Sequence, residues 1–125
     1  MKNVIKIKKD GSKMYVHTDL PIRASQFMAF SDQKLKENII SINDAVGVIN
    51  KIKCFEYNFK YNKEKIHYGV LAQQLEDIEK LKPLVENIED LKTVNYIEII
   101  PWLIKAVQEL TEEIANLREQ NHVKN

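Results

Sequence analysis

Ser31, with the carboxylate of Asp32 beside it and the lysines Lys34 and Lys36 three and five residues after it, begins the stretch of this chain whose residue types could do covalent chemistry. A serine hydroxyl becomes a nucleophile when a neighbouring base takes its proton, and a lysine amine is that base in the Ser-Lys variant of the catalytic triad. Lysine is ordinarily protonated at neutral pH, so such a pair acts only where burial or a nearby cation favours the neutral amine. If Lys36 is the base, Lys34 is a candidate for that cation, and Asp32 either holds Lys36 in place or only interacts with the helix dipole.

The same stretch also has the composition of a helix start. Ser31 would be the N-cap, Asp32 would lie in the first turn near the positive end of the helix dipole, and the lysines would lie in water. Residues five apart on a continuous helix lie about 140° apart around its axis. Ser31 therefore meets Lys36 only if it precedes the helix with its chain folded back, or if the lysine belongs to a neighbouring copy.

A β-hairpin is predicted for residues 4–17, because the turn signal Asp10-Gly11 lies between alternating apolar residues. This turn would pair Ile7 with Met14. A two-stranded ribbon is marginally stable alone in water, so the hairpin needs a partner surface. Four apolar side chains would share one face of it: Ile5, Ile7, Met14 and Val16.

The middle of the chain predicts a helix followed by two strands. Apolar residues recur at helical spacing over about 33–51, which favours an amphipathic helix. Aromatic and polar residues alternate over 55–61, as in a strand, and a polar turn at 62–65 leads to a second strand at 66–68. We expect the aromatic stripe to face a core, because no basic surface accompanies it as in a base-stacking platform.

The chain then continues as a short helix, a hairpin and a long helix. Gly69 opens the short helix, which ends before Pro83 because proline cannot continue it. The second hairpin is expected to turn at residues 89–90.

The last helix carries the pattern of a coiled coil. Asn95 with Glu98 predicts a capping box at its start, and Pro101 predicts a kink. Beyond Pro101, apolar residues alternate in four- and three-residue steps, and the next position in this series is the polar Asn121, of the kind that fixes register. The predicted seam residues are Leu103, Val107, Leu110, Ile114 and Leu117.

Composition and charge exclude several classes of protein. The 125 residues, 44% of them hydrophobic, suffice for one domain, or for a small domain with an appendage. A net charge of +1 gives no electrostatic case for binding nucleic acid or a membrane surface. The single Cys54 excludes an internal disulfide, and no signal peptide or apolar run of roughly 18 residues is present. No metal or cofactor is expected, since no ligand spacing relates the histidines His17, His67 and His122.

Three blocks of residues occur in a fixed order along the chain. They are Ser31-Asp32-x-Lys34-Leu35-Lys36-x-Asn38-Ile39, then Phe55-x-Tyr57 with Tyr68-Gly69-Val70-Leu71-Ala72-Gln73-x-Leu75-Glu76, and then Val94-x-Tyr96-x-x-Ile99-Ile100-Pro101 running into Leu103-Ile104-x-Ala106-Val107-Gln108-Glu109-Leu110. On these blocks, the chain from Ser31 onward resembles the intramolecular chaperone auto-processing domain at the C-terminus of phage endosialidase tailspikes and tail fibres. A related domain occurs in the myelin regulatory factor.

The resemblance implies a homotrimer and a self-cleaving serine peptidase of the Ser-Lys type that acts once. It assigns Ser31 as the nucleophile and Lys36 as its base. Residues 1–30 would be the β-structured end of a fibre, and 31–125 the auto-processing domain, with a coiled coil at about 96–121. The domain would trimerise, assist the folding of the upstream tail-fibre or tailspike stem, and cut itself free. The implied location is the phage tail of the virion, with fibre assembly in the host cytoplasm.

We therefore expect an α+β fold. A small domain of helices and short β-hairpins would end in a long coiled-coil helix and follow an N-terminal β-hairpin stub. The expected partners are further copies of the chain and the upstream fibre segment as folding client, with no nucleic acid and no membrane. Because only 30 residues precede Ser31, we expect either a fragment of a fibre or a separate small protein.

The bond that breaks and the function both have alternatives. The resemblance favours the Ser31–Asp32 bond, whereas attack of the hydroxyl on the preceding carbonyl passes through a five-membered ring and splits Phe30–Ser31. One alternative function is a non-cleaving trimerisation module of a fibre, in which Ser31 is only an N-cap. Another is a membrane-released transcription factor fragment, against which the lack of a basic patch and of a membrane span argues.

Overall fold

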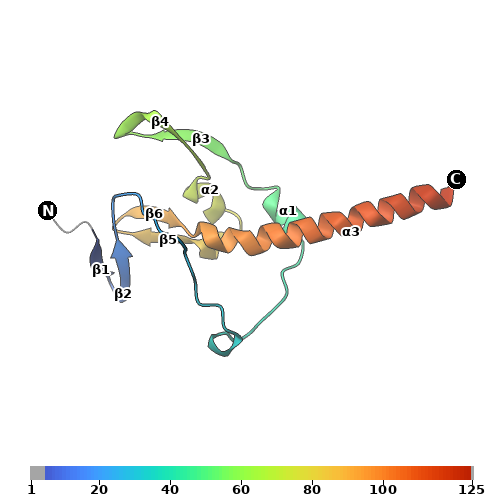
Figure 1. Cartoon of the computed structure of the whole chain (residues 1–125), viewed down its shortest axis with the longest axis horizontal. Helices are drawn as coiled ribbons and strands as arrows, with labels where there is room; N and C mark the ends of the chain where they lie inside the picture. Colours follow the sequence, from blue (N-terminus) through green and yellow to red (C-terminus); the bar gives the residue numbers. More distant parts are fainter. Residues whose placement is uncertain (1–4, 125) are drawn as a thin grey trace. The chain divides into compact units, whose positions relative to one another are not determined.

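The computed structural model describes residues 5–124 and the side chains of residues 5–122 (Figure 1). It confirms the predicted α+β fold, because short antiparallel hairpins precede one long C-terminal helix. The chain forms two compact units, the first ending at Ile40 and the second beginning at Ser41. None of its described helices is both long enough and apolar enough to cross a lipid bilayer.

The first unit consists of a hairpin and an extended segment. Strand β1 (Lys6–Asp10) pairs antiparallel with β2 (Lys13–His17), which confirms the predicted N-terminal hairpin. The following segment contains one short 3₁₀ helix, η1 (Gln33–Leu35). Every residue from 19 to 40 is exposed, and none of the described residues of this unit is buried.

The predicted turn of this hairpin is wrong by one residue. Gly11 and Ser12 form the turn, so Ile7 lies opposite Val16 and not opposite Met14. Gly11 has a φ of 61°, the left-handed conformation that the first central residue of a type II′ turn adopts. Because the shift changes each pairing by two positions, the four apolar side chains still share a face, and they are 62–74% exposed.

The long helix predicted for 33–51 is wrong. Only η1 and α1 (Ala45–Ile49) are helical in that stretch. Asn38 and Asp44 between them have φ values of 54° and 52°. A right-handed helix cannot pass through such residues, and the apolar side chains up to Ile40 stay exposed, so their helical spacing marks no buried face.

The second unit contains two separate two-stranded sheets. Strand β3 (Phe55–Phe59) pairs with β4 (Asn62–Gly69), which confirms the two predicted strands, although their turn lies earlier than predicted because β4 already begins at Asn62. Tyr57 stacks on His67 with ring centroids 5.5 Å apart. The predicted core face is wrong at Tyr61, which is 81% exposed.

The second sheet confirms the hairpin expected at 89–90. Strand β5 (Val85–Ile88) pairs with β6 (Leu91–Val94) in a regular register. The two turn residues, Glu89 and Asp90, have φ values of 51° and 65°. Positive φ at both central residues is the type I′ conformation, whose twist matches that of the flanking strands.

A small apolar core lies between α1, α2 (Ala72–Glu76) and the second sheet. The helix predicted from Gly69 to Pro83 is confirmed only over α2, and Pro83 lies inside a separate 3₁₀ turn, η2 (Lys82–Leu84). Leu75 and Leu81 are fully buried. The buried residues of the cluster are Val48, Leu75, Ile78, Leu81 and Leu84.

The chain ends in the 25-residue helix α3 (Ile100–Lys124), which follows the 3₁₀ turn η3 (Tyr96–Ile99). Figure 1 shows α1 beside the first half of α3. The predicted kink is wrong, because Pro101 is the second residue of α3, where its missing N–H has no intrahelical partner to lose. The predicted capping box is also wrong, since the Asn95 side chain makes no capping hydrogen bond.

Candidate functional site

Ser31 and Lys36 lie at hydrogen-bonding distance within one chain. The Lys36 Nζ donates a hydrogen bond of 2.8 Å to the Ser31 Oγ. Between them lies η1, a single turn that Lys36 ends in an extended conformation (φ −117°, ψ 146°). Because neither residue lies inside a continuous helix, the angular separation of about 140° does not apply, and the chain folds back far enough for the two side chains to meet.

Asp32 organises this turn. Its backbone is extended and its Oδ1 accepts a hydrogen bond of 2.9 Å from the backbone N of Lys34. Asp32 is therefore the N-cap, and the interpretation of Ser31 as the N-cap is wrong. The carboxylate of Asp32 binds the backbone of the turn and forms no ion pair with Lys36. The Ser31 hydroxyl is thus left for the lysine.

The pair is open to water in a single chain. Ser31, Lys36 and the candidate cation Lys34 are all exposed, as is every other residue from 19 to 40. Phe30, which precedes the serine, is 95% exposed. Both candidate scissile bonds, Phe30–Ser31 and Ser31–Asp32, therefore lie in accessible extended chain. In the described part of the chain, no three His, Cys, Asp or Glu side chains gather as a metal site requires.

Helix α3 has two distinct faces. At about 100° per residue, Trp102, Ala106 and Glu109 fall on one line, and this face packs on α1 and the core. The predicted seam lies about 90° further around the helix and is uncovered. Its members are 43–62% exposed: Leu103, Val107, Leu110, Ile114 and Leu117.

Glu109 joins α3 to the start of α1, a contact that the sequence did not predict. Its Oε2 accepts a hydrogen bond of 3.0 Å from the backbone N of Ala45, and its Oε1 accepts one of 2.9 Å from Val46. These two N–H groups begin α1 and have no intrahelical acceptor. The signal in the sequence was weak, because an acidic residue in a long charged helix usually faces water.

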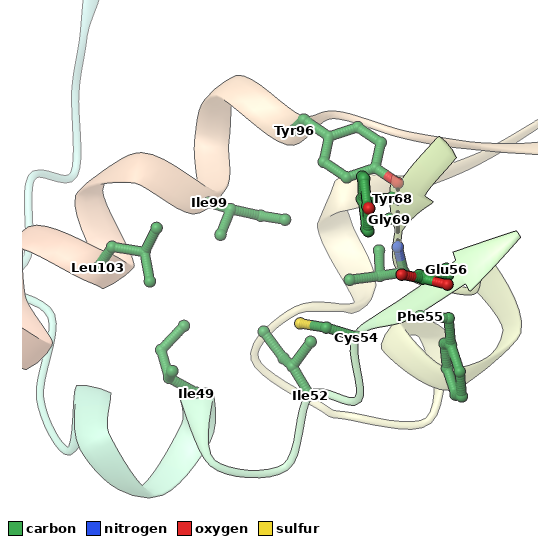
Figure 2. A pocket seen from close by; sticks show the side chains of 11 residues that line it. Ile49, Ile52, Cys54, Phe55, Glu56, Tyr68, Gly69, Tyr96, Ile99 and Leu103 are labelled. Atoms are coloured by element: carbon green, nitrogen blue, oxygen red, sulfur yellow. Dashed lines mark hydrogen bonds between the residues drawn. The ribbon is translucent and has the colours of Figure 1, made fainter. Parts of the chain in front are cut away.

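A pocket of about 630 Å³ opens in the second unit between α1, the β3–β4 hairpin and the start of α3 (Figure 2). Most of its wall is apolar, and Ile49, Ile52 and Ile99 point into it. The Tyr96 hydroxyl accepts a hydrogen bond of 3.2 Å from the backbone N of Val70. Of the predicted site residues only the seam residue Leu103 lines it, so the pocket holds none of the proposed catalytic groups.

One family of known proteins matches the stretch that begins at the serine. The family model described as the chaperone of endosialidase covers residues 31–86. Over these residues the chain is similar to the endosialidase chaperone family. The predicted resemblance is confirmed over this stretch, and the family is one of peptidases. No curated protein matches the chain.

The chaperone-family match starts at Ser31 and includes Lys36, α1, the β3–β4 hairpin and α2. It ends at Glu86, so β6 and α3 lie outside it. The match assigns no catalytic or assembly role to any individual residue.

Proposed function

We propose that this chain is an intramolecular chaperone that trimerises, assists the folding of an upstream β-structured tail-fibre or tailspike stem, and releases itself by a single cut at Ser31. The 2.8 Å hydrogen bond between Lys36 and Ser31 carries this proposal. It joins a nucleophile and a base at the first residue of a match to a chaperone family of peptidases. The implied location is the phage tail, with assembly in the host cytoplasm.

The proposed reaction begins with transfer of the Ser31 hydroxyl proton to the neutral Lys36 amine. The Oγ then attacks a backbone carbonyl carbon, and the departing amide nitrogen takes the proton as the C–N bond breaks. This leaves an ester at the serine, which water hydrolyses to a carboxylate. If the carbonyl is that of Phe30, the attack is intramolecular through a five-membered ring. Cleavage of Ser31–Asp32, which the family resemblance favours, requires the serine of a neighbouring subunit, because self-attack would form a four-membered ring.

Assembly would complete this site. A lysine amine accepts a proton only where its charged form is disfavoured, by burial or by a nearby cation such as Lys34. In one chain, Lys36 is exposed. Neighbouring subunits that cover the segment around Ser31 would supply the burial, so that cutting follows trimerisation.

Two uncovered apolar surfaces support the assembly part of the proposal. One is the face of the β1–β2 hairpin, and the other is the seam of α3. A two-stranded ribbon is only marginally stable alone in water. In the second half of α3, every residue from 110 to 122 is likewise exposed. Further copies of the chain would cover both.

Substitution at the two catalytic positions tests the proposal. The wild-type protein should appear as two fragments divided beside residue 31, whereas Ser31→Ala should stay whole. Lys36→Arg keeps a cation and a hydrogen-bond donor but cannot act as a base, so it should slow cleavage at least about 100-fold. Lys34→Arg is the matched control and should be cut normally. Intact mass spectrometry would read each result and would distinguish the two bonds, whose products differ by one serine.

The alternative function is a structural trimerisation module that does not cut. The cap that Asp32 provides to η1 favours it, because this contact gives the segment a folding role without chemistry. A wild-type protein that assembles and stays uncut for days would establish this alternative and refute the peptidase.

A further inference from the structure

The apolar pocket of the second unit is preformed. Tyr96 and Val70 both line it, and the hydrogen bond between the Tyr96 hydroxyl and the Val70 N–H joins these two parts of its wall (Figure 2). Gly69 permits this approach, because a Cβ atom there would lie 2.6 Å from the Tyr96 Oη. The volume of about 630 Å³ falls within the range of roughly 300–1,000 Å³ that is usual for ligand pockets. The pocket is therefore large enough to hold a short peptide segment.

A single charged residue, Glu56, stands among the residues that line this pocket. Its side chain is exposed, and it forms no hydrogen bond or ion pair with any residue that the structure describes. Interfaces combine a buried apolar centre with charges at the rim, and those charges choose partners of opposite sign. An apolar wall beside a free carboxylate therefore fits a partner that carries both large apolar side chains and a cation.

The segment before Ser31 carries both. Phe27, Met28 and Phe30 are 70–95% exposed, so their own chain leaves them uncovered. Arg23, four residues before Phe27, is exposed too, and it has no hydrogen bond or ion pair within the described part of the chain. Aromatic side chains that fill a pocket are frequent anchors of protein interfaces. In charge and in apolar character, this segment is complementary to the pocket.

We infer that the pocket of one subunit binds residues 27–30 of a second copy, with Glu56 paired to the partner's Arg23. This inference rests on the assembly part of the proposed function but not on the cut. Leu103 lines the pocket and also belongs to the α3 seam, so a copy that covers the seam would lie beside the pocket. Held there, the partner's Phe30 would fix the chain next to both candidate scissile bonds, and a fixed position of the reacting groups accelerates a reaction.

The native thiol of Cys54, which lines the pocket, tests the contact directly. In a Ser31→Ala background, which keeps the chains whole, Ala29→Cys places a second thiol between the two phenylalanines. We expect mild oxidation to link Cys54 of one chain to position 29 of the next, which gives covalent oligomers on a non-reducing gel. Ser12→Cys, in the exposed turn of the β1–β2 hairpin, is the matched control and should link few chains. Adding Cys54→Ser to Ala29→Cys should abolish the links, and links that persist would place the contact elsewhere.

An exchange of charges tests the ion pair and leaves the apolar contacts in place. Arg23→Glu puts a like charge opposite Glu56, so it should lower the fraction of chains that Ala29→Cys links several-fold. Adding Glu56→Arg should restore that fraction. If Arg23→Glu left it unchanged, the ion pair would be refuted.

Light scattering and intact mass spectrometry separate this inference from the proposed function. An oligomer in which Ala29→Cys links no better than Ser12→Cys, or in which the link closes within one chain, would overturn the pocket contact and leave the assembly standing. A protein that is monomeric at high micromolar concentration would overturn both. If the chains link through Cys54 while the wild-type protein stays uncut, the pocket contact holds and only the peptidase is refuted.

Discussion

Glu109 holds the start of α1 with both of its carboxylate oxygens. The N–H groups of Val46 and then Ala45 lower the pKa of this carboxyl, and Lys105 lowers it further, while desolvation raises it. The folded-state pKa therefore lies below its ordinary value of 4.5. The stabilisation is complete above the unfolded-state pKa and is lost as the pH falls through the folded-state value.

Substitution of Glu109 should therefore change both stability and its pH dependence. At pH 7 we expect the midpoint of denaturant unfolding to fall from wild type to Glu109→Gln, which keeps one acceptor oxygen, and further to Glu109→Ala. Glu109→Gln should also lose part of the stability change that wild type shows below pH 4.5. Glu112→Gln, on the exposed side of α3, is the control. Equal midpoints for Glu109→Ala and wild type would mean that the contact contributes nothing.

At the proposed catalytic pair, the sequence predicted the residue types and the family resemblance predicted their roles, but neither predicted the geometry. Ser31 was proposed from its chemistry and Lys36 from the family resemblance, and two routes by which the two side chains could meet were left open. The structure brings them together within one chain because Asp32, and not Ser31, caps η1. The sequence could not decide between Ser31 and Asp32 as the N-cap, because serine and aspartate are both favoured at that position. The outcome depends on which of the two adjacent side chains turns toward the backbone.

At the scale of elements, strands and hairpins were predicted better than helices. Alternation over β3 and the turn at 89–90 are local signals, and both appear in the structure. The helix over 33–51 failed because its apolar spacing belongs to a segment that is extended in one chain. Other subunits could cover the exposed apolar side chains of this segment. Helical spacing alone does not show whether an apolar side chain packs against its own chain or against another.

The β5–β6 turn gives a prediction at this scale. Asp90 has a φ of 65°, a conformation that costs a residue with a side chain about 1 kcal/mol and costs glycine nothing. Asp90→Gly should therefore stabilise the second unit by about 0.5–1 kcal/mol. The matched control is Asp77→Gly, because Asp77 has a φ of −80° and glycine relieves no strain there. A loss of stability in Asp90→Gly as large as in Asp77→Gly, measured by urea unfolding, would contradict the strain argument.

For the whole molecule, cleavage should depend on assembly. Ile114→Asp places a carboxylate in the α3 seam, where an unpaired buried charge costs several kcal/mol. We expect this variant to be monomeric where wild type is a trimer, and to be cut far more slowly although Ser31 and Lys36 are unchanged. Ala115→Asp adds the same charge on the outer side of the helix and should assemble and cut normally. A folded, monomeric Ile114→Asp that cuts at the wild-type rate would show that one chain contains the complete site.

The seam of α3 and the family resemblance favour different numbers of subunits. In the heptad of a coiled coil, Val107, Ile114 and Asn121 fall at the first position, a, and the leucines of the seam fall at the fourth, d. This pattern favours two-stranded parallel coils, whereas the family resemblance implies three subunits. The seam spans only residues 103–121. A stretch this short contributes little alone, so the remainder of the chain, including the apolar hairpin face, would determine the number.

In the proposed assembly, the second half of α3 would make the folding of this chain depend on its own abundance. From Leu110 to His122 the helix extends about 20 Å, and every residue in this stretch is exposed. Isolated helices of this length are marginal in water, so a newly made chain would hold this end as a helix only for part of the time. Only the chains whose ends are helical at the moment of encounter would associate, and because association needs at least two chains, its rate would rise more steeply than the concentration. Chains made close together, as on neighbouring ribosomes, would find one another long before the same chains diluted through a cell.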